Sequence, residues 1–382
     1  MTLSRRNSIK VIGAGMIVAA AGAAIAVPGL DAMPATAVEG WSGPPSSERD
    51  PRRRALAFAL LAPSPHNLQS WLVDLGRDGE VLLFVDGGRL LPQTDPLSRQ
   101  ILIGQGCFLE ILSIAAAAEG WRTETQLFPA GSWIVERPVA RIVFSRLPAP
   151  SVDPLFAEVP RRRTVKSRFE PRPLEAAHRN ALLASADLHG LRLSIVDEPA
   201  RVERLRSIAI AGSELEMNTP RTHKESIDVV RIGSAEIAAH RDGISIRGPM
   251  IWMLRQLGVM TPDKAMTPGT MAWNSGRDYI LAGYASAPAF GWLASRGNDR
   301  ATQIAAGRTW VRLQLAASAL GVSLQPHSQT LQEYPEMEAL RVAMRAETGV
   351  EGDETLQMFF RLGYAADPGP SPRRALDSIV KS

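Results

Sequence analysis

The stretch WLVDLGRDGEVLLFVD, residues 71–86, decides the fold class. Two apolar runs flank Gly-Arg-Asp-Gly-Glu, an arrangement typical of two antiparallel strands joined by a hairpin turn. Helical patterns lie on both sides, because residues 51–61 begin with proline and residues 99–120 form a long apolar run that ends at a glycine. Helices that alternate with short strands and a hairpin favour an α+β fold, with mainly antiparallel sheets packed against helices, over strict βαβ alternation.

Helical and strand-like patterns continue to alternate after a break at residues 148–154, PAPSVDP. We expect strands at 138–147 before the break and within 284–296 after it. Residues 300–321 predict a helix that stops at a glycine. The last apolar run, DETLQMFFRLGYA at 353–365, is interpreted as a helix that runs into a strand.

The composition excludes several classes of protein. Of the 382 residues, 45% are hydrophobic and 21% are charged, which are ordinary globular values. The net charge of +4 comes from scattered basic residues without interleaved aromatic side chains, so we expect no nucleic-acid partner. The single cysteine, Cys107, excludes an intramolecular disulfide, and six histidines far apart in sequence give no support for a metal site.

The N-terminus carries the pattern of an export signal. SRRNSIK at 4–10 precedes an uncharged, Ala- and Gly-rich run at 11–27, and ATA at 35–37 is a candidate cleavage site. The paired arginines resemble a twin-arginine signal. We therefore expect a signal peptide at 1–37, read by the twin-arginine export machinery, and a protein of the periplasm or cell envelope. An uncleaved membrane anchor is the alternative, although the apolar run is short for a span.

RRRTVKSRF, residues 161–169, places five cations and two hydroxyls in one short segment. Guanidinium forks and hydroxyls suit a phosphate monoester, which presents several acceptor oxygens. The alternative is a solvated basic turn before a helix.

APSPHNLQSW, residues 62–71, combines two rigid prolines with several polar side chains. If the segment is extended, Asn67 and Gln69 face the same way, and their amides can read the edge of a planar heterocycle. The alternative is a helix end at which Asn67 satisfies stray carbonyls. The chain lacks the G-x-G-x-x-G, G-x-x-x-x-G-K-[ST] and G-x-S-x-G motifs, which disfavours the common nucleotide folds and the serine hydrolase fold.

These motifs, taken in order, resemble the nitroreductase-fold FMN-binding superfamily. APSPHNLQSW resembles that family's Pro-Ser-x-x-Asn-x-Gln-Pro-Trp run, and RRRTVKSRF resembles its Arg-Arg-Ser/Thr element. LLFVDGGRLLPQTDP at 82–96 and the helix after it are similar to the Acg-type branch, in which one chain carries two nitroreductase-like halves. The resemblance covers about residues 52–374. It departs at Ser70, where the family has proline, and at Lys166, where it usually has arginine.

The resemblance implies two pseudo-repeated halves, 51–150 and 151–382, preceded by a linker at 38–50, with FMN held between them. The first half would contact the flavin ring and the second half its phosphate. The implied cofactor-binding residues are Ser64, Asn67, Gln69, Arg162, Arg163, Thr164, Lys166 and Arg374. The chain would act as a monomer with an internal pseudo-dimer, or as a homodimer.

The resemblance also implies an FMN-dependent oxidoreductase. Electrons would pass from a reduced nicotinamide or another donor, through flavin N5, to a nitro, quinone or similar small-molecule acceptor. Lys166 is a candidate to stabilise anionic reduced flavin, and no catalytic residue is assigned. One alternative is a non-catalytic protein that sequesters FMN under the apolar segment 243–271, and a cofactor-free protein of the export pathway is another.

Four further residues have simple interpretations. His66 would stabilise its loop or stack near the flavin, and His327 would lie near the site or on a surface turn. Asp95, before a proline, is a candidate turn residue or helix cap. Cys107 lies in an apolar run and is expected to be buried.

Overall fold

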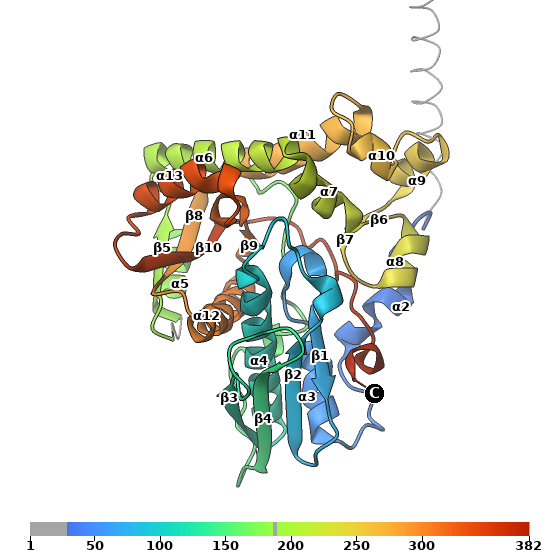
Figure 1. Cartoon of the computed structure of the whole chain (residues 1–382), viewed down its shortest axis with the longest axis vertical. Coiled ribbons are helices and arrows are strands. Elements are labelled where there is room, and N and C mark those ends of the chain that lie inside the picture. Colours follow the sequence, from blue (N-terminus) through green and yellow to red (C-terminus); the bar gives the residue numbers. More distant parts are fainter. Residues whose placement is uncertain (1–28, 186–188, 382) are drawn as a thin grey trace, which may run out of the picture.

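The computed structural model describes residues 29–185 and 189–381, and two antiparallel sheets with their helices dominate it (Figure 1). The first sheet has the order β1-β2-β4-β3, from β1 (Trp71–Asp74), β2 (Glu80–Val85), β3 (Trp121–Leu127) and β4 (Pro138–Arg146). The second has the order β5-β8-β10-β9, from β5 (Arg192–Val196), β8 (Ala289–Arg296), β9 (Ser323–Pro326) and β10 (Glu354–Gly363). Their pairings are antiparallel, and the α+β prediction is confirmed.

Helices cover and connect these sheets. In chain order they are α2 (Ala35–Val38), α3 (Pro51–Ala59), α4 (Arg99–Ala118), α5 (Ala176–Ser185), α6 (Pro199–Asn218), α7 (Pro220–Asp228), α8 (Ser234–His240), α9 (Pro249–Gln256), α10 (Pro262–Ala265), α11 (Met271–Ala285), α12 (Arg300–Ala319) and α13 (Glu338–Thr348). The helices expected at 51–61, 99–120 and 300–321 are confirmed. Of the expected signal segment 1–37, only residues 29–37 belong to the described chain.

The two sheets follow one plan. In each, a helix precedes the first strand, and another helix joins the second strand to the third: α3 and α4 in the first sheet, α5 and α12 in the second. The difference lies between the first two strands. A short turn joins β1 to β2, whereas residues 197–288 separate β5 from β8 and contain α6 to α11.

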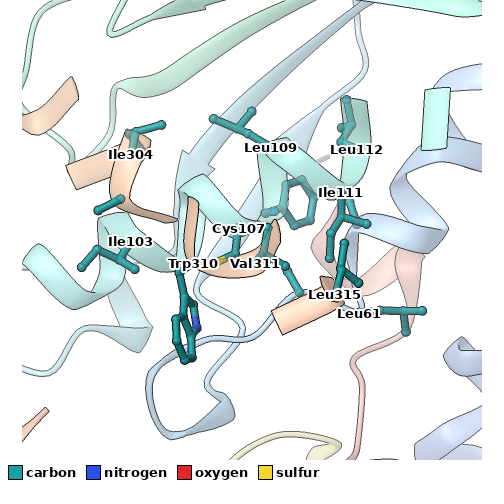
Figure 2. Packing of buried hydrophobic residues seen from close by; sticks show 14 of the residues in the cluster. Leu61, Ile103, Cys107, Leu109, Ile111, Leu112, Ile304, Trp310, Val311 and Leu315 are labelled. Atoms are coloured by element: carbon teal, nitrogen blue, oxygen red, sulfur yellow. The ribbon is translucent and has the colours of Figure 1, made fainter. Parts of the chain in front are cut away.

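The α4 and α12 helices cross at the centre of the molecule, where their apolar side chains gather with Leu61 (Figure 2). The crossing is close because each helix presents a glycine there. A Cβ built on Gly106 would lie 2.1 Å from the carbonyl oxygen of Ile304, and one on Gly307 would lie 1.9 Å from that of Ile103. The two backbones therefore touch directly. By length and composition α4 is apolar enough to cross a membrane, but here most of it is buried inside the protein.

The interpretation of residues 353–365 as a helix followed by a strand is wrong. The whole of β10 is a strand, paired with β8 on one side and β9 on the other, and its helix comes earlier, as α13. Because a central strand buried on both faces is apolar throughout, periodicity cannot distinguish it from a buried helix.

Residues 197–288 form an insertion with its own small core. Ile232, Met253, Leu254, Met260 and Ala272 are its buried apolar members. Within it, β6 (Val230–Ile232) and β7 (Ile244–Ile246) pair in parallel. The segment 243–271, expected to be a cover or a packed insertion, contributes β7, α9 and α10 to this unit.

After β10 the chain leaves the second sheet and returns to the first. Val380 forms a parallel bridge with Val73 of β1, and the Lys381 N–H donates to the Val73 carbonyl at 2.8 Å. This C-terminal segment ends beside α3 and β1 (Figure 1). On the way, residues 372–374 bond to Asn67 and Gln69 of the loop that follows α3.

Candidate functional site

The loop at 62–70 has an unusual backbone. His66, Asn67 and Gln69 all adopt positive φ, at 48°, 56° and 53°. Such left-handed conformations cost side-chain-bearing residues free energy and cluster at functional sites. The segment is therefore not extended, in contrast to the assumption behind the shared face of Asn67 and Gln69. The Ser64 hydroxyl stabilises the turn by accepting the Gln69 N–H at 2.9 Å.

Asn67 joins three distant parts of the chain. Its side-chain nitrogen donates to the carbonyl of Pro372 at 3.1 Å and to that of Gly243 at 3.4 Å. Its side-chain oxygen accepts from the Arg373 guanidinium at 2.9 Å. Asn67 does satisfy stray carbonyls, as the alternative interpretation supposed, but those carbonyls lie in the insertion and the C-terminal segment.

Gln69 is fully buried and uses both ends of its amide. The side-chain oxygen accepts the Arg374 N–H at 2.8 Å, and the nitrogen donates to the Arg241 carbonyl at 3.0 Å. The Arg374 guanidinium donates to the Gln69 carbonyl and lies 3.4 Å from the Asp86 carboxylate. Gln69 and Arg374 thus support one another, and Arg374 has a carboxylate partner of its own.

An arginine cluster lies next to this loop. The guanidiniums of Arg162 and Arg373 donate to the same carbonyl oxygen, that of Leu61, at 3.0 and 3.1 Å. The guanidinium carbons of Arg163, Arg373 and Arg162 lie 4.5, 4.8 and 6.0 Å from the centre of the Trp41 ring. Three cations therefore converge where the loop after α3 meets the C-terminal segment.

Counter-charge is scarce in the arginine cluster. Within the described residues, the one carboxylate at ion-pair distance is Asp367, which lies 3.3 Å from Arg163 and is mostly exposed to solvent. Burial, together with the charge of Arg163, lowers the pKa of Arg162 to about 10. Burial and both neighbouring cations hold the pKa of Arg373 well below its usual value. The cluster therefore gains stability from any anion that binds it.

Short-range backbone hydrogen bonds position Arg161 and Arg162. The N–H groups of both residues donate to the Glu158 carbonyl and so continue the helical turn at 156–158. Past the cluster, the Val165 N–H donates to the Leu324 carbonyl and ties the segment to β9. The Thr164 hydroxyl accepts from Arg162 at 3.4 Å.

Arg361 of β10 holds the segment after the cluster. Its side chain is fully buried, and burial lowers the pKa of its guanidinium to about 10. Its donors reach the carbonyl oxygens of Val165, Lys166, Ser167 and Gly283, and the side chains of Gln325 and Ser286. Arg361 therefore fixes the backbone from which Lys166 projects.

The charge of Lys166 acts on His66. The Lys166 residue as a whole is exposed, yet protein atoms around its ammonium lower its pKa by desolvation. Burial, and then the charge of Lys166, lower the pKa of His66 to about 4. The His66 Nδ1 atom is buried without a hydrogen-bond partner. At neutral pH the imidazole is uncharged beside a cation.

Asp95 and Cys107 have structural roles. The Asp95 carboxylate accepts the N–H groups of Gln100 and Ile101 at the start of α4, so the prediction of a helix cap is confirmed. Cys107 is buried at the helix crossing, as expected, and burial raises the pKa of its thiol.

His327 does not lie on a surface turn. It is 5% exposed, and its ring centre is 4.0 Å from that of Tyr284. Burial, and the charge of Arg361, hold the pKa of His327 well below its usual value.

The structure thus gathers most of the sequence-predicted residues and adds three that the sequence analysis missed. The cluster contains the predicted Arg162 and Arg163, with Thr164 beside them. The loop next to it contains the predicted Ser64, Asn67 and Gln69. Arg373, Arg361 and Trp41 were missed. Arg373 stands next to the predicted Arg374, and both are buried: Arg373 reaches the cluster, whereas Arg374 bonds to Gln69 and lies near Asp86.

A cavity of about 170 Å³ adjoins the cluster. Its lining includes Arg161, Arg163, Val165, Gln314 and Asp367. Among the described residues, no group of three or more His, Cys, Asp or Glu side chains is arranged to hold a metal ion. The side chains at the cluster are cationic and rich in N–H donors, which is a composition that suits an anion.

No family model matches the chain, but individual known proteins are similar to it. The chain is 27% identical over 339 residues to a candidate NAD(P)H nitroreductase of Mycobacterium tuberculosis strain H37Rv. The aligned region covers 86% of this chain and 90% of that protein. A second candidate NAD(P)H nitroreductase of that strain, acg, is 38% identical over 77 residues, 20% of this chain and 23% of that one. Among solved structures, the FMN-dependent nitroreductase NfnB of Mycobacterium smegmatis in complex with NADPH is 19% identical, covers 57% of this chain and 92% of its own, and has a TM-score of 0.34.

Proposed function

We propose that the chain is an FMN-binding oxidoreductase of the nitroreductase type, with two nitroreductase-like halves in one polypeptide. The observation that carries the proposal is the arginine cluster, which has buried cations and only one, exposed carboxylate near it in the described chain. The similarity to candidate NAD(P)H nitroreductases supports the reaction type. The shared order of the two sheets supports the two halves.

FMN suits this site through its phosphate. A phosphate monoester carries up to two negative charges and several acceptor oxygens, and guanidinium forks bind such groups in a bidentate way. In the proposal Arg162, Arg163 and Arg373 hold the phosphate, with the Thr164 hydroxyl beside them. The Nε atoms of Arg162 and Arg373 are buried without hydrogen-bond partners, so donors remain for the phosphate oxygens.

The loop at 62–70 and Lys166 would then face the flavin ring. When bound, FMN would supply the redox chemistry. It would accept a hydride and pass the electrons to a small-molecule acceptor such as a nitro compound or a quinone. The residues of the chain bind and orient it. Lys166 places positive charge where the reduced ring gains negative charge, and the neutral His66 beside it adds no competing charge.

A second candidate function is storage of FMN without turnover. The observation that favours it is the latch between the insertion and the loop, formed by Asn67 and Gln69 with the backbone of 241–243. Arg89 strengthens this latch through an ion pair with the buried Asp242. An insertion held in this way restricts access to the ring from that side.

We also propose export by the twin-arginine route, which would place the protein in the periplasm or cell envelope as a monomer or homodimer. The support comes from the sequence of residues 4–37. The test replaces Arg5 and Arg6 with lysine and locates the protein by cell fractionation. We expect loss of export.

The test of function is the absorbance spectrum of the purified protein, followed by identification of the released cofactor and anaerobic addition of NADPH. A flavin spectrum that bleaches supports a reductase, and a flavin spectrum that persists with NADPH supports storage. A colourless protein that takes up no added FMN contradicts both.

A variant pair makes this test specific to the site. Arg162→Met should weaken FMN binding about 100-fold, since it removes a buried charge-assisted contact. Arg204→Met is the matched control, because Arg204 lies on α6, is mostly exposed to solvent and makes an ion pair with Glu347 of α13. Equal affinities in the two variants would contradict the assignment.

A further inference from the structure

The N-terminal clasp, residues 30–42, is part of the folded body. Leu30 packs against the core of the insertion. The Asp31 carboxylate is buried and accepts the N–H groups of Ser234 at 2.6 Å and Gly248 at 2.8 Å, at the starts of α8 and α9. The clasp therefore begins on the insertion.

The other end of the clasp lies on the arginine cluster. Ala37 is fully buried, and its carbonyl accepts the Arg373 N–H at 2.8 Å. The Trp41 Nε1–H donates to the Ser371 carbonyl at 2.7 Å, and the Trp41 ring lies against the guanidiniums of Arg163 and Arg373. One segment of thirteen residues thus bridges the insertion and the cations.

The stacking leaves the cations free to bind an anion. A guanidinium presents its flat face to an aromatic ring and its N–H groups along its edge, so it can stack and still bind phosphate oxygens. The ring also shields one side of the cluster from water, which strengthens charge interactions on the other side.

We propose that Trp41 is a positioning residue that closes the phosphate end of the cofactor site, and that the clasp slows release of FMN. This rests on the proposed function, because it takes FMN as the ligand. Release requires the clasp to lift from the cluster, and the anchor at Asp31 opposes that motion.

The clasp has a consequence for processing of the export signal. Cleavage after Ala37 would remove Asp31 with its two hydrogen bonds and the carbonyl that pairs with Arg373. The proposal therefore requires an exported protein that keeps residues 31–37, with any cleavage before Gly29. The intact mass of the exported protein identifies its first residue. A mass that corresponds to a chain beginning at Val38 overturns the clasp.

The direct test measures the rate of FMN release from the purified protein, by the recovery of free flavin fluorescence after dilution. Trp41→Ala should release FMN about tenfold faster, because three cation–π contacts are lost, and Trp41→Phe should fall between it and the unchanged protein. Trp133→Ala is the matched control, because Trp133 is 65% exposed and lies in the loop before β4. Asp31→Asn should also speed release.

Riboflavin, which lacks the phosphate, separates a phosphate clasp from a general loss of structure. The affinity for riboflavin should be the same in Trp41→Ala and Trp133→Ala. The clasp is overturned if Trp41→Ala and Trp41→Phe release FMN at an unchanged or slower rate. It is also overturned if Trp41→Ala loses as much affinity for riboflavin as for FMN. Failure of every variant and of the unchanged protein to bind FMN overturns the proposed function and the clasp that rests on it.

Discussion

The helix crossing and the arginine cluster lie on either side of the loop after α3, and they are built on opposite principles. At the crossing, Gly106 and Gly307 let two backbones touch, and the surrounding side chains are apolar and buried. At the cluster, buried cations face one another next to three residues with positive φ. The crossing is closely packed and mainly apolar, whereas the cluster brings like charges and left-handed backbone together.

The difference indicates which region serves stability and which serves binding. Natural proteins depart from locally favourable choices mainly at functional sites. The cluster departs in charge, in backbone conformation and in unsatisfied donors, all in one place. Four changes test this division.

The largest effect should come from the crossing. Gly307→Ala places a methyl group 1.9 Å from the Ile103 carbonyl oxygen, so the helices must separate. We expect a loss of about 3 kcal/mol in the free energy of unfolding, measured by urea denaturation. Gly276→Ala, within α11 and with open space around its Cβ, is the control and should be neutral or slightly stabilising. Equal stability of the two variants would show that the crossing is not closely packed.

The second effect should appear in binding. Arg373→Met removes a buried cation of the cluster, and we expect about 100-fold weaker FMN binding, equivalent to about 2.7 kcal/mol. Riboflavin affinity should change much less. Arg172→Met, which removes an exposed arginine paired with Glu170, is the control, and titration of flavin fluorescence measures all three proteins. Similar losses for FMN and riboflavin would contradict a phosphate role.

The third effect is a dependence of stability on pH. The folded state holds the pKa of His66 at about 4, against an ordinary value of 6.5, so the unfolded state binds a proton first as pH falls. The stability that depends on neutral His66 is therefore present above pH 6.5 and is lost as pH falls from 6.5 to 4, by about 2 kcal/mol after allowance for partial access of solvent. His66→Asn should reduce the slope of the unfolding free energy against pH in this range, and the slope that remains includes His327, whose pKa is also held low.

The smallest effect should come from backbone strain. His66→Ala and His66→Gly both remove the imidazole and differ only in the Cβ, at a residue with φ of 48°. We expect the glycine variant to be more stable by about 1 kcal/mol, measured by thermal unfolding. An alanine variant of equal or greater stability would mean that the loop is not strained.

Much of the fold could be predicted from sequence because its signals are local. The hairpin at 71–86, the proline-initiated helix at 51–59 and the glycine after α12 carry their information within a few residues. The strand β10 could not be predicted, because its two neighbours in the sheet supply the burial that makes it apolar. The approach of α4 to α12 through two glycines is likewise a long-range property.

The site was predictable in its segments but not in its geometry. The segments 62–71 and 161–169 were singled out by unusual residue combinations, and the structure brings them together at the Leu61 carbonyl. The left-handed loop, the different partners of Arg373 and Arg374, and the position of Trp41 depend on contacts between residues hundreds of positions apart. No pattern within one segment records such contacts.

The return of the C-terminal segment to the first sheet also sets the order of events during synthesis. Trp41 and Ser371, which share a hydrogen bond, are 330 residues apart, so roughly 15 to 65 s of translation separate them at ~5–20 residues per second. Arg373 follows still later. A nascent chain on the ribosome can complete the hairpin and the first sheet, but the arginine cluster stays incomplete until nearly all the described chain has emerged. Under the proposed function, cofactor capture is therefore a late step that follows synthesis of Arg373 and its contact with the N-terminal clasp.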